Sequence, residues 1–444
     1  MTKNLTEGSP LKLIFFFTLP LIAGNIFQQM YAFVDTLIVG RFLGVAALAA
    51  VGCTGSLMFL MIGFVMGTTT GFSIYTGQRF GARDAAGVRR SAAACALLSL
   101  AVSLVLTVFG TALCRSFLVW MQTPPEILED AVRFISIVYG GISLMVFFAM
   151  QTNLIRALGD SRTPTYLLAF GLTVNIILEP VFILGLDLGV SGAALATVAS
   201  QVIGNLVCFF YIFKRVPALH ARKEDWHLTR ADVWAHLRIG LPMGFQTSVI
   251  ALGAVILQVA LNHLGPVAVA AYAAAQKVDM IATMPMMSFG MAMAAYTAQN
   301  YGARKLGRIR EGVKKCALMS VAFSLAVGLF NIFFGPSIME LFVGEGQAQV
   351  VEYGQMYLIV NGVSYSVLAL LFIFRYTLQG LGQTMVPTVA GLMELVMRAL
   401  AALVLVNSWG YIGACFANPL AWIGSCVPLA AAYWLTRRHL QDSV

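Results

Sequence analysis

The chain has 444 residues, of which 59% are hydrophobic and 11% are charged, and its formal net charge is +9. A soluble domain carries roughly 25% charged residues, so this composition excludes a water-exposed surface over most of the protein, and lipid must cover it. The seven cysteines have no CxxC spacing and the five histidines are scattered, which argues against a metal site.

Long runs without charged residues predict membrane-spanning helices. Residues 13–34, 42–78 and 316–339 contain no Asp, Glu, Lys or Arg, and a spanning helix needs only about 20 apolar residues. No run alternates as the strands of a membrane barrel do. We therefore predict an all-α integral membrane protein with twelve transmembrane helices, at 11–38, 46–77, 91–114, 130–156, 163–185, 190–213, 238–263, 267–300, 316–336, 350–376, 386–407 and 410–435.

Basic residues are distributed unequally between alternate loops. Of the 28 Lys and Arg residues, 23 fall on one side of the predicted helices and three on the other, while Lys277 and Arg398 lie inside helices. The positive-inside rule places the rich side in the cytoplasm. We therefore expect a multi-pass protein of the cytoplasmic membrane, with both termini in the cytoplasm. The net charge then reflects topology, and no nucleic-acid partner is expected.

The second half of the chain repeats the first at a nearly constant offset of 221 to 223 positions. The matched pairs include Pro20 and Pro242, Gly81 and Gly302, and Gly192 and Gly413. The halves therefore share one ancestral unit of six helices, and such parallel repeats occur in secondary transporters. We predict an N-lobe at 1–215, a cytoplasmic linker at 216–237 that forms a surface helix, and a C-lobe at 238–444.

Four short segments carry a family resemblance: 35–41 (DTLIVGR), 77–83 (GQRFGAR), 175–180 (NIILEP) and 298–304 (AQNYGAR). Together with the predicted two repeats of six helices, these segments make the whole chain resemble the multidrug and toxic compound extrusion (MATE) family, of the bacterial multidrug efflux type. The resemblance implies a V-shaped pair of six-helix lobes and export of organic, often cationic, compounds or drugs in exchange for protons or sodium ions. It also suggests a monomer, and no cofactor is expected.

Asp35 is the strongest candidate for a functional residue. An ionised carboxylate at the bilayer centre costs about 2.5–3.5 kcal/mol on insertion scales, so such a residue usually has a function. Gln28, Tyr31 and Asp35 are spaced i, i+3 and i+7, which places them on one polar stripe of the first helix. The alternative is a structural carboxyl group that is hydrogen-bonded within the bundle.

A second group of polar residues lies on the helices at 163–185 and 190–213. Asn175 and Glu179 are four apart and share a face, and Pro180 cannot donate a backbone hydrogen bond, which leaves a carbonyl free. Thr197 and Gln201, also four apart, could complete a small cation site. The resemblance matches the family's N-lobe cation site to Asp35, Asn175, Glu179 and Thr197. The family commonly has Asp at position 179, so the choice of ion stays open.

The second half has a different set of charged residues. Lys277 and Asp279 are two apart, so they do not face each other and each needs another partner. Glu394 and Arg398 are four apart, which predicts an intrahelical ion pair of structural or functional use. Some family branches carry acidic residues on the helices that correspond to 238–263 and 350–376. This chain lacks those, which favours a coupling site in the N-lobe.

Substrate contacts are predicted from flexible and aromatic side chains. Methionine adapts to varied ligands, and aromatic faces attract cations, although ordinary packing is the alternative for each residue. The predicted cavity residues are Met280, Met284, Met287, Tyr357, Asn361 and Tyr365.

The predicted function is a secondary active multidrug efflux antiporter that works by alternating access. A flippase for lipid-linked precursors is the runner-up, but it would favour a basic cavity where this chain has acidic residues. A membrane-embedded enzyme would need a convergent catalytic set such as an in-membrane histidine, and the histidines lie in predicted loops or at helix ends.

Overall fold

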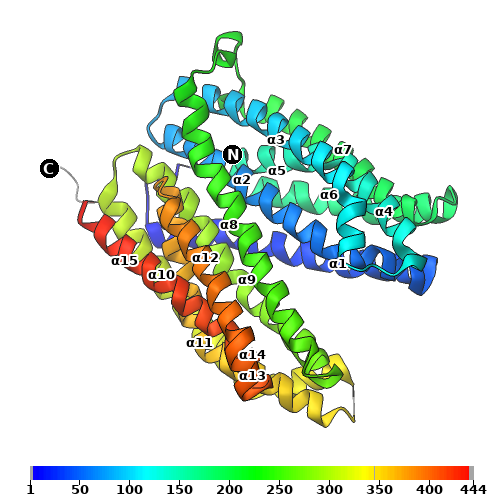
Figure 1. The fold of residues 1–444 in the computed structure, drawn as a ribbon. Helices are drawn as coiled ribbons and strands as arrows, with labels where there is room; N and C mark the ends of the chain where they lie inside the picture. The colour runs from blue at the N-terminus through cyan, green and yellow to red at the C-terminus, as the bar shows by residue number, and fades with distance from the viewer. Residues whose placement is uncertain (1–3, 345, 440–444) are drawn as a thin grey trace. The chain divides into compact units, whose positions relative to one another are not determined.

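The computed structural model describes residues 4–344 and 346–439, and these ranges are helical without a strand (Figure 1). Eleven of the described helices are long and apolar enough to cross a membrane. A twelfth span is obtained when α4 (Pro125–Gly140) and α5 (Ile142–Ala157), bent by 46° relative to each other, are counted as one. The predicted all-α membrane fold is therefore confirmed.

The other long helices begin and end as follows: α1 (Pro10–Cys53), α2 (Gly55–Gly81), α3 (Ala85–Trp120), α6 (Arg162–Pro180), α7 (Gly189–Arg215), α8 (Arg230–Asn262), α9 (Pro266–Gly302), α10 (Leu306–Val343), α11 (Ala348–Gly380), α12 (Met385–Leu400) and α15 (Ala417–His439). Two short helices, α13 (Val406–Trp409) and α14 (Tyr411–Cys415), lie between the last two.

Several helices are longer than predicted. α3 begins six residues before the predicted start at 91, and α10 begins ten residues before 316. The charge-free run marks only the apolar part of a helix, and a helix can continue past it with polar side chains. α1 continues to Cys53 with a break at Gly44. The φ of Gly44 is 85°, a value that glycine adopts readily because it has no Cβ atom. The predicted helix start at 46 falls just after this break, and the helical backbone then continues through Thr54 into α2.

The segment before α8 is not the surface helix predicted for 216–237. It contains two short 3₁₀ turns, η2 (Pro217–Leu219) and η3 (Lys223–Trp226), before α8 begins at Arg230. Asp225 closes the second turn, because its Oδ2 atom accepts a hydrogen bond from the Arg222 backbone N–H at 2.8 Å. Together with the Arg222 side chain it forms a capping box, which here begins only a short 3₁₀ turn that ends at Trp226.

Two compact units divide the described chain. Unit 1 contains Leu19–Gly244, and unit 2 contains Leu5–Thr18 together with the residues from Phe245 onward. The divisions fall inside α1 and α8, within three residues of Pro20 and Pro242, which the repeat had already matched. The predicted lobe and linker boundaries stay a prediction, because these units describe packing and not the path through a membrane.

Close contacts fix the segment that leads into α1 within unit 2 and the first half of α8 within unit 1. In unit 2, Gln299 Oε1 accepts a hydrogen bond from the Leu5 backbone N–H at 2.9 Å, and Lys305 Nζ donates to the Thr6 carbonyl at 2.9 Å. In unit 1, a Cβ atom on Gly71 would lie 2.5 Å from Gly240 Cα. Small residues at such a contact allow helix backbones to approach closely.

A π-helical turn follows the same helix in both repeats. η1 (Val181–Gly185) follows α6, and η4 (Ala401–Leu405) follows α12. A glycine of the next helix packs on each turn: a Cβ atom on Gly192 would lie 2.9 Å from the Phe182 carbonyl carbon, and one on Gly413 would lie 2.1 Å from the Leu405 oxygen. The structure thus gives the Gly192–Gly413 match a steric reason.

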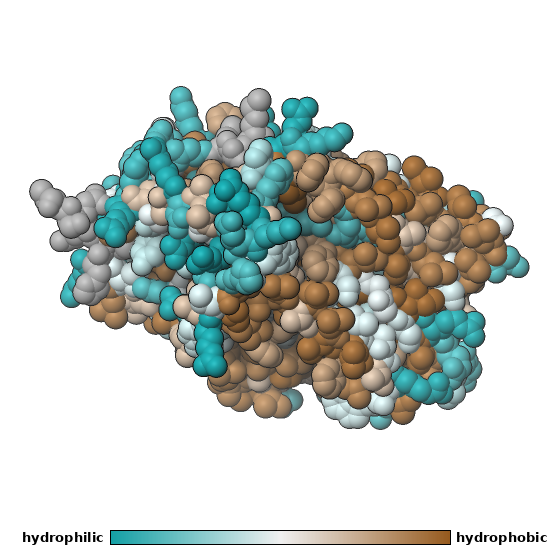
Figure 2. Space-filling model, turned by 90° about the horizontal axis from the view of Figure 1, so that it is seen from above, coloured by the Kyte–Doolittle hydropathy of each residue, from teal (hydrophilic) through white to brown (hydrophobic). Residues whose placement is uncertain are grey.

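Much of the protein surface is apolar. Figure 2 shows broad hydrophobic areas on one face, with hydrophilic side chains gathered in separate patches. Large hydrophobic side chains such as Phe33, Trp120 and Phe333 are 68%, 81% and 74% exposed. Exposed apolar area on this scale is expected where lipid replaces water.

Candidate functional site

Unit 1 brings two carboxyl groups together between α1 and α6. Asp35 of α1 is half-buried, and Tyr31 Oη, one turn earlier, donates a hydrogen bond to its Oδ1 atom at 3.4 Å. Glu179, at the end of α6, is fully buried. The two carboxyl groups are near enough to interact with each other. The sequence separation of 144 residues gave no direct sign of this proximity.

The amide of Asn175 links this pair to α7. Its Nδ2 atom donates to Thr197 Oγ1 at 3.4 Å and to Ser200 Oγ at 3.3 Å. Both amide hydrogens are therefore used, and the amide oxygen remains as an acceptor. Ser200 is absent from the predicted site, although it is three residues after Thr197 and so on nearly the same face of α7.

Three buried oxygen atoms of this site have no hydrogen-bond partner among the described residues: Oε1 and Oε2 of Glu179 and Oδ1 of Asn175. An isolated ionised carboxylate away from water is very costly. The site must therefore be neutralised when it is closed, either by a proton on the carboxyl pair or by a small cation between the oxygens. Carboxylate, amide and hydroxyl oxygens suit a hard cation.

The remaining predicted residues of the N-lobe site, Gln28 and Gln201, are less buried than Asn175 and Glu179. Gln28 is exposed on α1, so only part of the predicted polar stripe is buried. Gln201 is half-buried on α7, one turn beyond Thr197. Their roles stay predictions.

The charged residues of unit 2 form a buried cluster. Glu394 forms the predicted intrahelical pair with Arg398, with Oε2 and Nη2 3.7 Å apart. It also pairs with Arg375 of α11, which donates to Ser425 Oγ as well. Arg375, one of the 23 basic residues counted on the predicted cytoplasmic side, is buried beside Glu394, and its side of the membrane stays a prediction. Lys277 is exposed.

The residues predicted to line a substrate cavity divide into two groups. Met280 and Met287 are half-buried, and Met284 is 9% exposed. The α11 residues are fully buried, which leaves no exposed surface for a ligand on Tyr357, Asn361 or Tyr365. The role of all six in binding substrate stays a prediction.

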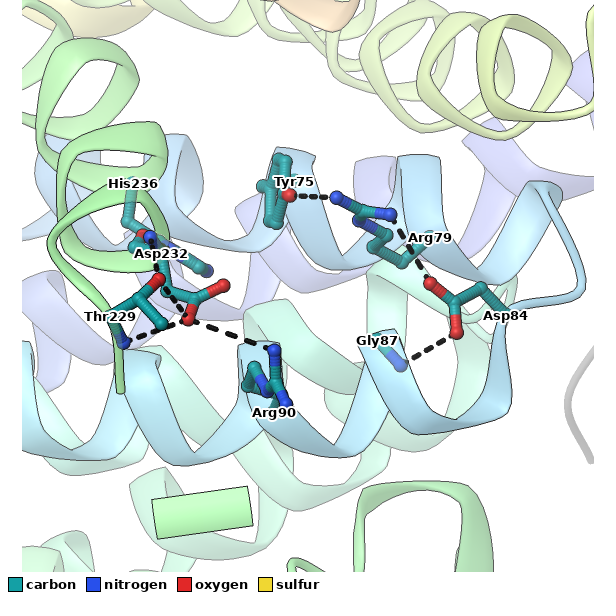
Figure 3. Close-up of polar contacts among 8 residues, drawn as sticks. All are labelled: Tyr75, Arg79, Asp84, Gly87, Arg90, Thr229, Asp232 and His236. Carbon is teal, nitrogen blue, oxygen red and sulfur yellow. Dashed lines mark hydrogen bonds and ion pairs between the residues drawn. The ribbon is translucent and has the colours of Figure 1, made fainter. Parts of the chain in front are cut away.

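Figure 3 shows two groups of polar contacts in unit 1: one joins the start of α8 to α3, and the other joins the end of α2 to the start of α3. Asp232 Oδ2 lies 3.9 Å from Arg90 Nη1, and His236 Nδ1 lies 2.7 Å from the Asp232 carbonyl oxygen. On α2, Arg79 binds both Tyr75 and Asp84. His236 is fully buried, which its place near a helix end did not suggest.

The fold and this site define the class of the protein. Repeated units of long apolar helices, one of them with a carboxyl pair of which Glu179 is fully buried, are typical of ion-coupled membrane transporters. The MatE family model matches residues 20–181 and 242–404. The chain therefore belongs to the MatE family of multidrug and toxic compound extrusion transporters, and it is a multi-pass membrane protein.

Individual relatives agree with this assignment. The probable multidrug resistance protein YoeA of Bacillus subtilis (strain 168) is 28% identical over 396 residues, which cover 88% of this chain and 85% of YoeA. The FAD transporter of Shewanella oneidensis is 24% identical, with 87% of this chain and 86% of that protein covered.

A solved structure has the same fold. It is described as the outward-facing conformation of a multidrug resistance MATE family transporter of the MOP superfamily, and it superposes with a TM-score of 0.91. The match covers 99% of this chain and 98% of that chain at 24% identity.

Proposed function

We propose that this protein is a secondary active efflux antiporter. It exports organic, often cationic, compounds or drugs across the cytoplasmic membrane by alternating access, with both termini in the cytoplasm, and it takes up protons or sodium ions in exchange. The name of the relative YoeA, a probable multidrug resistance protein, supports this class of substrate. The coupling ion is proposed to bind at Asp35, Asn175, Glu179 and Thr197.

The observation that carries the proposal is the group of partnerless oxygens on Glu179 and Asn175. Because Glu179 is fully buried, its charge cannot be compensated by water. A proton or a sodium ion removes the unfavourable charge and stabilises the closed arrangement of α1, α6 and α7. Without the ion, the two carboxyl groups repel each other, which favours a different packing of α1.

The site also offers a physical reason for exchange. An organic cation and the coupling ion are both attracted by the negative charge of Asp35 and Glu179, so binding of one weakens binding of the other. The organic cation therefore leaves the site more readily on the side where the coupling ion is abundant, and the coupling ion leaves more readily on the side where the organic cation is abundant. The inward gradient of the coupling ion then drives export of the organic cation.

The test is efflux of a fluorescent organic cation from proteoliposomes under an imposed proton gradient or an imposed sodium gradient. The wild type is compared with Asp35→Asn and Glu179→Gln, which keep the side-chain shape and remove the charge. Asp187→Asn is the matched control, because Asp187 is exposed and its φ of 51° is one that asparagine also adopts.

Transport that follows one gradient, is lost in both site variants and persists in the control supports the proposal and identifies the ion. Transport by Glu179→Gln at the wild-type rate contradicts the coupling site. If neither gradient moves any organic cation, the antiporter function itself is wrong, and movement of a labelled lipid-linked precursor becomes the assay to run.

A further inference from the structure

A lysine side chain is exposed on α9, in a part of the chain that is almost free of charge. Between positions 238 and 304, only Lys277 and Asp279 are Asp, Glu, Lys or Arg. Lys277 is eleven positions after Pro266, the first residue of α9, which corresponds to about 16 Å along the helix. That distance is about half the thickness of a hydrocarbon core of about 30 Å. The ammonium group therefore lies far from the helix end, where lysine side chains normally reach the membrane interface.

The exposed face of α9 around Lys277 differs from a lipid-facing surface. The other residues that are exposed between Pro266 and Ile281 are small or polar, namely Ala270, Ala273 and Gln276. The exposed surface of α10, in contrast, carries large apolar side chains such as Leu325, Phe330 and Phe333. Charged residues inside membrane helices almost always face the bundle interior or a water-filled cavity. The composition and the charge together indicate that this face of α9 borders water.

The ammonium group of Lys277 forms no ion pair or hydrogen bond with another side chain in the described part of the chain. Asp279 does not compensate it, because Asp279 is buried on a different face of α9. There its Oδ1 atom accepts a hydrogen bond from Tyr365 Oη at 2.8 Å. Charged residues within membrane helices are normally paired, so the free donors of Lys277 are an unusual feature of this helix.

The buried charges of unit 2 balance without Lys277. Glu394 pairs with both Arg375 and Arg398, and Asp279 lies near enough to Arg398 to interact with it. Two carboxylates therefore compensate two guanidinium groups, which keep their protons in proteins. Lys277 adds one positive charge that neither carboxylate neutralises, so the charge that this face of α9 lacks is that of an anion.

We propose that Lys277 binds the acidic group of an exported compound, and that this protein accepts amphipathic organic anions in addition to organic cations. The ammonium group offers three hydrogen-bond donors, which suit a carboxylate or a sulfonate. Met280 and Ile281 follow Lys277 by three and four residues, so they lie beside it on the helix surface. Met280 is half-buried and Ile281 is exposed, and both offer apolar surface to the rest of the ligand.

The depth of Lys277 excludes a lipid headgroup as the ligand. Lipid phosphates lie outside the hydrocarbon core, whereas Lys277 is eleven residues from the nearer end of α9. An organic anion that enters a water-filled space can reach this position. The inference rests on the proposed antiport for export of the anion, but binding of the anion is independent of it.

The first test compares two dyes that share a xanthene ring system and differ in charge: fluorescein, an anion at neutral pH, and rhodamine 123, a cation. Binding of each dye to the purified protein in detergent is measured by fluorescence polarisation, without a gradient. Lys277→Gln should weaken binding of fluorescein by about tenfold, because the lost contact is a hydrogen bond between charged groups. It should leave rhodamine 123 bound as tightly as before, or more tightly since a repulsive charge is gone.

Two further variants make the comparison specific. Lys277→Arg keeps the positive charge and should retain binding of fluorescein. Lys314→Gln, at an exposed position of α10, is the matched control and should bind both dyes like the wild type. In proteoliposomes, the gradient that drives export of rhodamine 123 should also drive export of fluorescein, and Lys277→Gln should lose only export of fluorescein.

The proposal is overturned if the wild type does not bind fluorescein, if Lys277→Gln binds it as tightly as the wild type, or if Lys277→Arg binds it no better than Lys277→Gln. Equal weakening of both dyes in Lys277→Gln would also overturn it, because a structural role of the lysine gives that result. So would a wild type that exports rhodamine 123 but not fluorescein. Failure of the proposed antiport would instead appear as no gradient-driven movement of either dye, with Lys277-dependent binding of fluorescein unchanged.

Discussion

The side chains of Ser91 and His236, 145 positions apart in the chain, meet at 2.8 Å between Oγ and Nε2. His236 Nδ1 faces the Asp232 carbonyl oxygen at 2.7 Å, and a carbonyl can only accept, so Nδ1 carries the hydrogen. Nε2 of the neutral ring therefore accepts from the Ser91 hydroxyl. This contact joins α3 to the first turns of α8 and holds the linker end against unit 1.

Replacement of Ser91 by alanine should destabilise the protein by about 1–3 kcal/mol, because it leaves the buried acceptor of His236 without its donor. The measurement is the melting temperature of the purified protein in detergent. Ser116→Ala is the control, since Ser116 is exposed on the same helix. Equal melting temperatures for the two variants would show that the Ser91–His236 bond does not stabilise this junction.

Gly71→Ala should weaken the packing of α2 against α8. The added Cβ atom would lie 2.5 Å from Gly240 Cα, and a backbone cannot yield as a side chain does. Overpacking of this kind typically costs about 1–3 kcal/mol. Gly171→Ala in α6 is the control, because its Cβ atom meets nothing within 4 Å. A melting temperature that falls no further for Gly71→Ala than for Gly171→Ala would contradict the close contact.

Glu394→Gln should be strongly destabilising, by about 3–5 kcal/mol. The change leaves Arg375 and Arg398 buried without the carboxylate that compensates them. The yield of folded protein and its melting temperature are the measurements. Glu352→Gln, at an exposed position of α11, should behave like the wild type. Normal folding of Glu394→Gln would mean that the two arginines are compensated elsewhere.

The linker turn should respond to acid through Asp225. The hydrogen bond from the Arg222 backbone N–H and the ion pair with Arg89 hold the pKa of Asp225 below its usual value. A carboxyl group with a depressed pKa stabilises the folded state above its unfolded pKa, about 3.9, and this contribution is lost as the pH falls through the folded value.

Asp225→Asn should therefore be less stable than the wild type at neutral pH, by about 1–2 kcal/mol. The difference should begin to shrink below about pH 4 and vanish once the pH falls below the depressed pKa of Asp225 in the folded state. Melting temperatures measured across this range test the prediction, with the exposed neighbour Glu224→Gln as control. A difference that is independent of pH would show that the charge of Asp225 is not what stabilises the turn.

The general fold could be predicted from the sequence because lipid imposes a simple compositional requirement. Every span must be apolar over about 20 residues, and such runs are visible in the chain without any knowledge of contacts. Helix ends were less predictable: α10 starts at Leu306 and not at 316, since a polar helical turn outside the apolar run looks like a loop. The predicted surface helix at 216–237 is wrong over 216–229, where the structure has two short 3₁₀ turns before α8 begins at Arg230.

The candidate site was predictable as a set of positions but not as an arrangement. Asp35 and Glu179 stand out because carboxyl groups are rare in apolar runs. Ser200 was missed, since a serine on a membrane helix is usually a packing residue and only the Asn175 amide gives it a role. The partnerless oxygens of Glu179 are likewise a property of the packed helices.

By itself, the sequence determined the helical membrane class, the repeat and the positions of the acidic residues, because apolar runs and matched motifs are local features of the chain. Only the tertiary structure decided which residues meet: Asp279 with Tyr365, Arg375 with Glu394, and Ser91 with His236. The physical reason is that partners on different helices are chosen by side-chain packing between segments distant in sequence, and no periodicity along one helix records that choice.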